Sequence, residues 1–198
     1  MIAEHIDKLQ NPLYLIIDMQ NAYKKGNVWE CPRFDIALLN IKTLLANVPP
    51  QNCIMTRYIA SKRPVGVWKD YNKINAEVNK NKQLNRICDE LLPYTSKIRV
   101  YDKSKYSSYC IDEVREAAKN ASCVVVTGVV ADCCVLSTVF SLIDAGKYVV
   151  YLVDAVAGVS PETEQATITA LKGLAYVHLS LTTTRKYLEA LHMSRANK

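Results

Sequence analysis

One stretch, residues 122–146, constrains the fold more than any other because three structural signals follow one another within it. The β-branched apolar run at 124–126 is typical of a buried strand. Asp132 then offers an N-cap, and Gly146 supplies a C-terminal stop. Between them, apolar residues recur at helical spacing, namely Val135, Val139, Leu142 and Ile143. The stretch therefore predicts a strand, a tight loop and a helix.

Two adjacent cysteines, Cys133 and Cys134, fall in the first turn of this predicted helix. Unpaired backbone N–H groups and the positive end of the helix dipole favour an anion there. We therefore expect a thiol at this position to have a lowered pKa and to act as a nucleophile. The alternative is an unreactive cysteine that only packs in the hydrophobic core. This is the usual role of cysteine and the one that we expect for Cys123 in the strand.

The length and the cysteine pattern bound the class of protein. The 198 residues are about the length of one domain, and we expect a single domain over residues 1–198. No apolar run approaches the ~20 residues needed to cross a bilayer, and the first ten residues do not resemble a signal peptide. The seven cysteines have no C-x-x-C spacing, which indicates neither a disulfide framework nor a zinc site. We expect a cytoplasmic protein that binds no membrane.

Positive charge is concentrated in residues 57–105, where twelve Lys or Arg against five Asp or Glu give a net charge of +7. Aromatic residues are interleaved with this charge, as they are on nucleic-acid surfaces. We interpret the stretch instead as a solvated face that can steer small anionic substrates, and we expect no nucleic-acid partner.

Strand-like and helix-like segments alternate along the rest of the chain. Further strands are expected at 13–17, 52–57, 98–101, 148–153 and 176–181. Further helices are expected at 34–46, 77–92, 111–119, 161–174 and 184–192. This alternation predicts a single-domain, three-layer α/β/α sandwich around a mainly parallel, Rossmann-like sheet of six strands.

Reactive side chains follow three of the expected strands. Asp18 ends the first strand, Lys103 follows the third, and Cys134 follows the fourth. Parallel sheets place ligands beyond the carboxyl ends of their strands, where the strand order reverses, so these side chains can converge. None of the three histidines lies near these loops in the sequence. A lysine beside a thiol stabilises the thiolate, and a buried carboxylate can accept its proton.

Three segments resemble the signatures of the isochorismatase-like cysteine hydrolases, which include nicotinamidases, N-carbamoylsarcosine amidases and ureidoacrylate amidohydrolases. The segments are IIDMQNAY at Ile16, DKSKYSSY at Asp102 and TGVVADCCVLST at Thr127. The resemblance runs from the first strand to the helix after Pro161 and is most specific in the third segment. It implies Asp18 as the proton-transferring carboxylate, Lys103 as its cationic partner and Cys134 as the nucleophile. Lys105 could replace Lys103, but we expect it to be solvated.

The resemblance also implies a cis peptide between Val129 and Val130, with the N–H groups of Val130 and Cys134 forming an oxyanion hole. Each such donor stabilises a tetrahedral oxyanion by about 3 kcal/mol. Cys133 is only a neighbour in this register. The family commonly has Thr where this chain has Ala131, so one hydroxyl near the loop is missing.

A second departure concerns metal binding. Nicotinamidases carry an Asp-x-His arrangement after the second strand, whereas this chain reads TRYIA at residues 56–60. We therefore expect no metal and no cofactor, and nicotinamide becomes a poor first choice of substrate. Aromatic walls and one cation would suit a small planar or carboxylate ligand. The candidates for these walls, with exposed loop residues as the alternative, are Arg57, Tyr58, Trp68 and Tyr106.

The residues and the resemblance together predict a hydrolase of a small amide or carbamoyl compound that acts through a thioester on Cys134. One alternative is isochorismatase-type cleavage of a vinyl ether, which relies on Asp18 rather than on the thiol. Another is a non-catalytic binding or redox-sensing protein that uses the pair of Cys133 and Cys134. Because members of the family tend to form dimers or tetramers, we expect a homo-oligomer.

Overall fold

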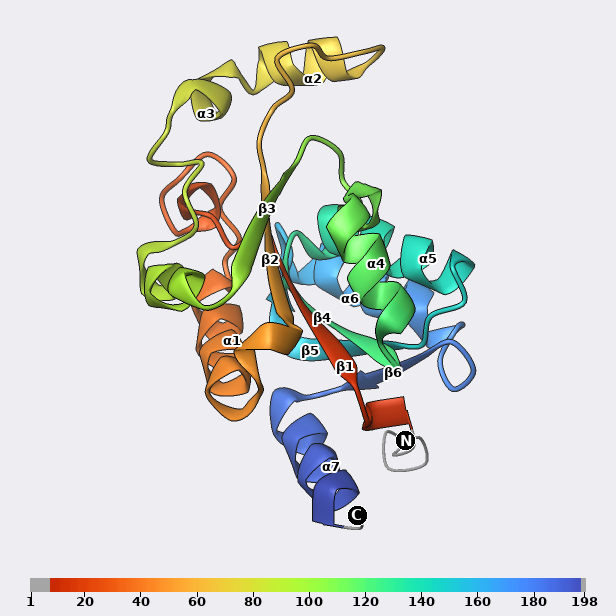
Figure 1. Cartoon of the computed structure of the whole chain (residues 1–198). Coiled ribbons are helices and arrows are strands. Elements are labelled where there is room, and N and C mark those ends of the chain that lie inside the picture. The colour runs from red at the N-terminus through yellow and green to blue at the C-terminus, as the bar shows by residue number, and fades with distance from the viewer. Residues whose placement is uncertain (1–7, 197–198) are drawn as a thin grey trace.

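The sheet is built from six short strands, most of them apolar, as the computed structural model shows for residues 8–196 (Figure 1). The strand order is β3-β2-β1-β4-β5-β6, and every neighbouring pair is parallel. The strands are β1 (Pro12–Ile17), β2 (Cys53–Tyr58), β3 (Arg99–Lys103), β4 (Cys123–Val129), β5 (Val149–Ala157) and β6 (Leu179–Thr182). This order confirms the predicted Rossmann-like sheet and places its reversal point between β1 and β4.

Helices cover both faces of the sheet. One face packs against α1 and α7, and the other packs against α4, α5 and α6 (Figure 1). These helices are α1 (Phe34–Asn47), α4 (Asp112–Asn120), α5 (Leu136–Asp144), α6 (Pro161–Lys172) and α7 (Thr184–Ala196). In β1, Tyr14 and Ile16 pack toward the first layer, whereas Leu15 and Ile17 pack toward the second. Burial on both faces explains why β1 and β4, in the middle of the sheet, read as continuous apolar runs, whereas the edge strand β3 does not.

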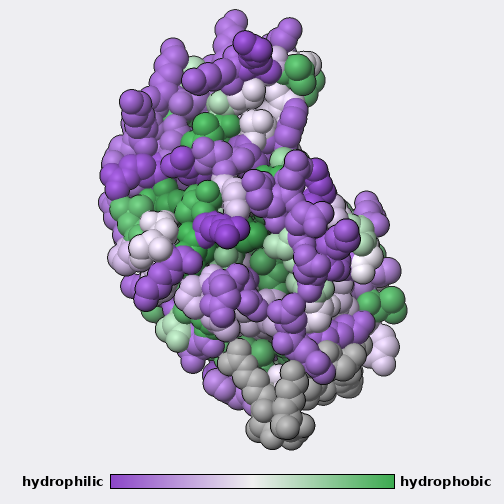
Figure 2. All heavy atoms as spheres, in the orientation of Figure 1, coloured by the Kyte–Doolittle hydropathy of each residue, from purple (hydrophilic) through white to green (hydrophobic). Residues whose placement is uncertain are grey.

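A projecting arm carries the two remaining α-helices, α2 (Trp68–Ile74) and α3 (Ala76–Lys80), beyond the carboxyl end of the sheet (Figure 1). Hydrophilic side chains cover much of this arm (Figure 2). Shorter turns complete the description: 3₁₀ helices at Asn21–Tyr23, Pro50–Asn52, Asp89–Ser96 and Ser108–Cys110, and a π-helical turn at Ala131–Val135. In the part of the chain that the structure describes, no helix is long and apolar enough to cross a membrane.

The helix predicted at 77–92 is wrong. α3 ends at Lys80, and the side chain of Asn81 then accepts hydrogen bonds from the backbone N–H groups of Gln83 and Leu84 at 3.0 and 3.2 Å. The amide of Asn85 donates back to the carbonyl of Val78 at 2.8 Å. Such local side-chain bonds compete with helical backbone bonds, so the chain turns here and resumes as a 3₁₀ helix.

Asp154 lies within β5, which continues to Ala157, rather than at the predicted end of the strand. Its carboxylate accepts hydrogen bonds from the backbone N–H and the hydroxyl of Thr184 at 2.8 and 2.9 Å. Asp154 therefore holds the start of α7 in place.

Candidate active site

Asp18, Lys103 and Cys134 meet beyond the carboxyl edge of the sheet, beside its reversal point. The Nζ atom of Lys103 lies 2.5 Å from Oδ2 of Asp18 and 3.3 Å from Sγ of Cys134. All three residues are at most 4% exposed. The structure thus brings together the three residues that the sequence singled out.

Asp18 directly follows β1 and is held in place by Thr56 of the neighbouring strand β2. Its backbone has φ of +52°, in the left-handed region that few non-glycine residues adopt. Its N–H donates to the carbonyl of Thr56 at 3.0 Å, and its Oδ1 accepts from the hydroxyl of Thr56 at 2.9 Å. The same hydroxyl lies 3.2 Å from that of Ser108. Both carboxylate oxygens of Asp18 are therefore held.

Lys103 is the last residue of β3, in register with Tyr58 of β2. Besides its contacts with Asp18 and Cys134, its Nζ donates to the carbonyl of Lys105 at 3.1 Å. An ammonium has three N–H donors, so every donor of Lys103 is used. Burial lowers the pKa of this ammonium, but the carboxylate of Asp18 and the hydrogen bonds to Asp18 and Cys134 outweigh burial, and the pKa is raised. Lys103 is therefore a cation that is wholly engaged inside the site.

Cys134 lies in the π-helical turn that joins β4 to α5. The predicted N-cap at Asp132 is wrong, because the turn begins after Val130 and Asp132 lies within its first residues. The peptide between Val129 and Val130 is cis, as the family resemblance implied. The hydroxyl of Thr138 donates to the carbonyl of Cys134 at 2.6 Å and so ties the turn to α5.

Gly128 allows β4 to approach β1 closely. Its φ is +109°, and a Cβ at this position would lie 2.0 Å from the carbonyl oxygen of Ile17. No other residue fits this contact. The close approach is what brings the loop of Cys134 beside Asp18, which directly follows Ile17.

The pKa of the Cys134 thiol is raised rather than lowered, which corrects the expectation from the helix dipole. Burial is the largest cause, and the charge of Asp18 raises the pKa further, whereas Lys103 lowers it. The resting site therefore holds a neutral thiol next to an ion pair of Asp18 and Lys103. A proton acceptor, not a free thiolate, is what such a thiol requires to attack a substrate.

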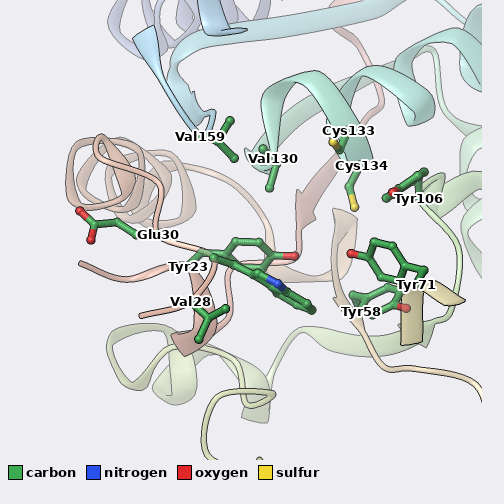
Figure 3. Close-up of a pocket in the computed structure, with 11 residues that line it drawn as sticks. Tyr23, Val28, Glu30, Tyr58, Tyr71, Tyr106, Val130, Cys133, Cys134 and Val159 are labelled. Carbon is green, nitrogen blue, oxygen red and sulfur yellow. The ribbon is translucent and has the colours of Figure 1, made fainter. Parts of the chain in front are cut away.

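A cavity of about 350 Å³ lies over Cys134 (Figure 3). Its lining consists of Tyr23, Val28, Trp29, Glu30, Tyr58, Tyr71, Tyr106, Val130, Cys133, Cys134 and Val159. Five of these residues were candidates from the sequence: Tyr58, Tyr106, Val130 and Cys134 as site residues, and Cys133 as the partner of Cys134 in the redox alternative. Tyr23 could have been found, because it lies within the signature segment that begins at Ile16, but nothing in the sequence pointed to Trp29 or Tyr71.

Arg57 and Trp68 do not belong to the lining, which corrects their assignment as candidates for its walls. Arg57 forms a two-bond ion pair with Asp102, its register partner on β3, at 2.5 and 3.2 Å. Trp68 lies behind the wall, with its ring centroid 6.4 Å from that of Tyr58 and 5.1 Å from that of Tyr106. Trp68 therefore supports the wall instead of facing the cavity.

Within residues 8–196, no group of three or more His, Cys, Asp or Glu side chains is arranged to hold a metal ion. Residues 56–60, where nicotinamidases place metal ligands, contribute Thr56 to the carboxylate of Asp18 and Tyr58 to the cavity wall. The absence of a metal from the working protein stays a prediction.

The family model of the isochorismatase domain matches residues 12–184 of this chain. The chain belongs to the isochorismatase family. The match covers all six strands and both signature loops that carry Asp18 and Cys134. Family membership makes the protein an isochorismatase-family hydrolase. Among curated proteins, none matches the sequence.

Solved structures of this isochorismatase fold include a cysteine hydrolase from Pseudomonas syringae pv. phaseolicola, with a TM-score of 0.77, 19% identity, and coverage of 94% of each chain. An N-carbamoylsarcosine amidase from Thermoplasma acidophilum has a TM-score of 0.67 and 18% identity, covering 88% of this chain and 97% of that chain. A pyrazinamidase from Pyrococcus horikoshii, in complex with zinc, has a TM-score of 0.69 and 16% identity, covering 87% and 99%. At these identities the likeness shows a shared fold.

Proposed function

We propose that this isochorismatase-family hydrolase cleaves a small amide or carbamoyl compound through a thioester on Cys134. The observation that carries the proposal is the unbroken chain of contacts from Asp18 through Lys103 to Cys134 at the floor of the cavity. A buried thiol with a raised pKa needs a nearby base, and Asp18 is the carboxylate within its reach.

In the first half of the reaction, Asp18 accepts the proton of the Cys134 thiol, and the sulfur attacks the substrate carbonyl carbon. The carbonyl electron pair moves to the oxygen, which accepts hydrogen bonds from the N–H groups of Val130 and Cys134. Two such donors stabilise the oxyanion by about 3 kcal/mol each. Lys103 keeps its charge and holds Asp18 and Cys134 together.

In the second half, the oxyanion collapses and the C–N bond breaks, while Asp18 returns the proton to the leaving amine. Water then attacks the thioester, with Asp18 as its base. The C–S bond breaks, the sulfur regains a proton from Asp18, and the acid leaves. The net reaction is hydrolysis of the C–N bond, with the protein restored.

The test is ammonia or amine release from a panel of small amides and carbamoyl compounds, with and without a chelator. We expect release by the wild type, in the presence of chelator, to vanish in Cys134→Ala and to persist in Cys110→Ala, which removes an exposed thiol. Mass spectrometry of the rapidly quenched reaction should find the acyl group on the peptide that contains Cys134. Full activity of Cys134→Ala would exclude the thioester.

The same panel separates the two alternatives. Cleavage of a vinyl ether that depends on Asp18 but not on Cys134 would favour isochorismatase-type chemistry. Reversible oxidation of Cys133 or Cys134, without hydrolysis of any compound, would favour a sensor. The single domain over residues 1–198, the cytoplasmic location, the homo-oligomer, and a small molecule as the partner in place of nucleic acid or membrane also stay predictions.

A further inference from the structure

Four tyrosines line the cavity, but their hydroxyls differ in what they bind. The hydroxyl of Tyr58 donates to the side-chain oxygen of Asn72 at 3.1 Å. The hydroxyls of Tyr23, Tyr71 and Tyr106 have no hydrogen-bond partner among the residues that the structure describes. Figure 3 shows the hydroxyls of Tyr23 and Tyr71 pointing toward each other across the cavity, and that of Tyr106 pointing toward the same space. Three unused phenols thus face the region over Cys134.

The rings that carry these hydroxyls are held by two tryptophans. The ring of Tyr23 lies 5.4 Å from that of Trp29, and the rings of Tyr71 and Tyr106 lie 5.3 and 5.1 Å from that of Trp68, all measured between centroids. These edge and tilted contacts fix the direction in which each hydroxyl points. Burial raises the pKa of all three phenols, so each remains a neutral hydrogen-bond donor.

The cations near the cavity are already committed. All three donors of Lys103 are used, and Arg57 is paired with Asp102. The ammonium of Lys105 lies 4.8 Å from the centroid of the Trp68 ring, and Lys105 is not among the residues that line the cavity. No Lys or Arg belongs to the lining within residues 8–196. A substrate carboxylate would therefore enter the cavity without a cation to offset its desolvation.

The one charged side chain in the described lining is Glu30. Its Oε2 accepts the N–H of Gly26 at 2.7 Å, and Figure 3 shows its carboxylate turned away from the three phenols. A negative charge at this wall adds repulsion against an anionic substrate. The cavity thus combines flat aromatic walls, neutral donors and no available cation.

We propose that Tyr23, Tyr71 and Tyr106 form a phenol frame, a set of hydrogen-bond donors that selects a flat, uncharged substrate with acceptor atoms beside its reacting carbonyl, in a cavity whose lack of a free cation excludes carboxylates. This proposal rests on the proposed function, because the three phenols surround the thiol that is assigned to the reaction. A site built to hydrogen-bond its substrate discriminates against analogues that lack the partner atoms.

The first test uses alkylation of Cys134, which requires the cavity but no hydrolysis. In both iodoacetamide and iodoacetate, the sulfur displaces iodide and forms an S–C bond, but only iodoacetamide presents a neutral amide. Peptide mass spectrometry gives the rate at Cys134 and, in the same sample, at the exposed Cys110. We expect the preference for iodoacetamide over iodoacetate to be about 10-fold greater at Cys134 than at Cys110, since only the cavity excludes the carboxylate.

Single substitutions then assign the preference to the frame. Tyr23→Phe and Tyr71→Phe should each slow alkylation of Cys134 by iodoacetamide about 3- to 10-fold, the loss expected for one neutral hydrogen bond. Alkylation of Cys110 should not change. Tyr101→Phe, which removes a phenol outside the cavity, is the matched control and should leave both rates unchanged.

Protection experiments test the need for acceptor atoms. Pyridinecarboxamides should protect Cys134 from iodoacetamide better than benzamide does, and 4-carboxybenzamide should not protect it. The preference for pyridinecarboxamides over benzamide should disappear when all three phenols are replaced by Phe, whereas 4-carboxybenzamide should still fail to protect because the lining still has no cation. Equal protection by every compound, or unchanged selectivity in the Phe variants, overturns the phenol frame even if hydrolysis depends on Cys134. If the frame behaves as expected but no amide is hydrolysed, the proposed function fails and the frame stands.

Discussion

The floor of the cavity, around Asp18, Lys103 and Cys134, and its wall of tyrosines differ in whether their polar groups have hydrogen-bond partners. At the floor, Asp18, Lys103 and Thr56 come from the central sheet and its edge, and their polar groups are partnered by one another. At the wall, Tyr23 comes from a short 3₁₀ helix and Tyr71 from α2 of the projecting arm, and their hydroxyls face open space. Groups that are fully partnered suit one fixed reaction, whereas unpartnered groups on the short segments outside the sheet suit the choice of substrate.

The largest predicted effect separates two roles of Asp18 at the floor. Asp18→Asn removes the proton acceptor, so we expect amide hydrolysis to fall by about 10³-fold or more. The same change removes a charge that raises the pKa of Cys134, while Lys103, which lowers that pKa, stays in place. The pKa of the thiol should therefore fall, and alkylation by iodoacetamide should become faster at neutral pH.

The measurement is the pH dependence of Cys134 alkylation in the wild type and in Asp18→Asn. Its midpoint should move to lower pH in the variant, because a lowered pKa places more thiolate at each pH. A midpoint that moves to higher pH, or slower alkylation at every pH, would contradict the assignment of Asp18 as a charge that raises the pKa of the thiol beyond the effect of burial.

A second prediction concerns the stability of the floor. Lys103→Met leaves the carboxylate of Asp18 buried without its cation, which typically costs about 3 to 5 kcal/mol in the free energy of unfolding. Combining it with Asp18→Asn removes both charges and should restore much of this loss. Urea unfolding of both variants measures the difference, with the exposed Lys69→Met as control. A double variant less stable than Lys103→Met alone would show that the pair itself is not the source of the loss.

The floor was also the part of the site that the sequence predicted. Short β-branched runs specify buried parallel strands, and a polar residue at the end of such a run is placed at the carboxyl edge of the sheet. Asp18, Lys103 and Cys134 all follow from that rule and from the signature segments. The direction of the shift in the thiol pKa was predicted wrongly. The helix dipole is a local feature, whereas burial and the charge of Asp18 arise only from tertiary contacts.

The wall could be predicted only in part. Tyr71 lies on a short helix of the arm whose residues are not buried, so no apolar periodicity marks it. Arg57 faces outward in β2, and its pairing with Asp102 depends on the register between β2 and β3. The amide contacts of Asn81 and Asn85, which break the predicted helix, likewise involve neighbours that periodicity does not weigh. The residues that form the wall, and with them the proposed substrate selectivity, are therefore determined more by tertiary contacts than by sequence motifs.

The smallest predicted effect tests whether a change near the wall can alter substrate binding without altering the reaction at the floor. Glu164 is 7% exposed, and its Oε1 accepts the N–H of Gly158 at 2.9 Å, next to Val159 of the lining. Its other oxygen forms an ion pair with Arg33, at the start of α1. The pair therefore ties the segment of Gly158 and Val159 to the start of α1. Glu164→Gln keeps an acceptor for Gly158 but removes the charge that binds Arg33.

We expect Glu164→Gln to raise KM about 5-fold, because a less firmly held wall at Val159 binds substrate less well, and to change kcat by less than about 2-fold. Glu162→Gln, an exposed change in the same helical turn, is the matched control and should alter neither value. Steady-state kinetics on the best amide of the panel give both constants. A fall in kcat with KM unchanged would mean that Glu164 acts on the reaction at the floor. The wall at Val159 could then not be changed independently of the floor.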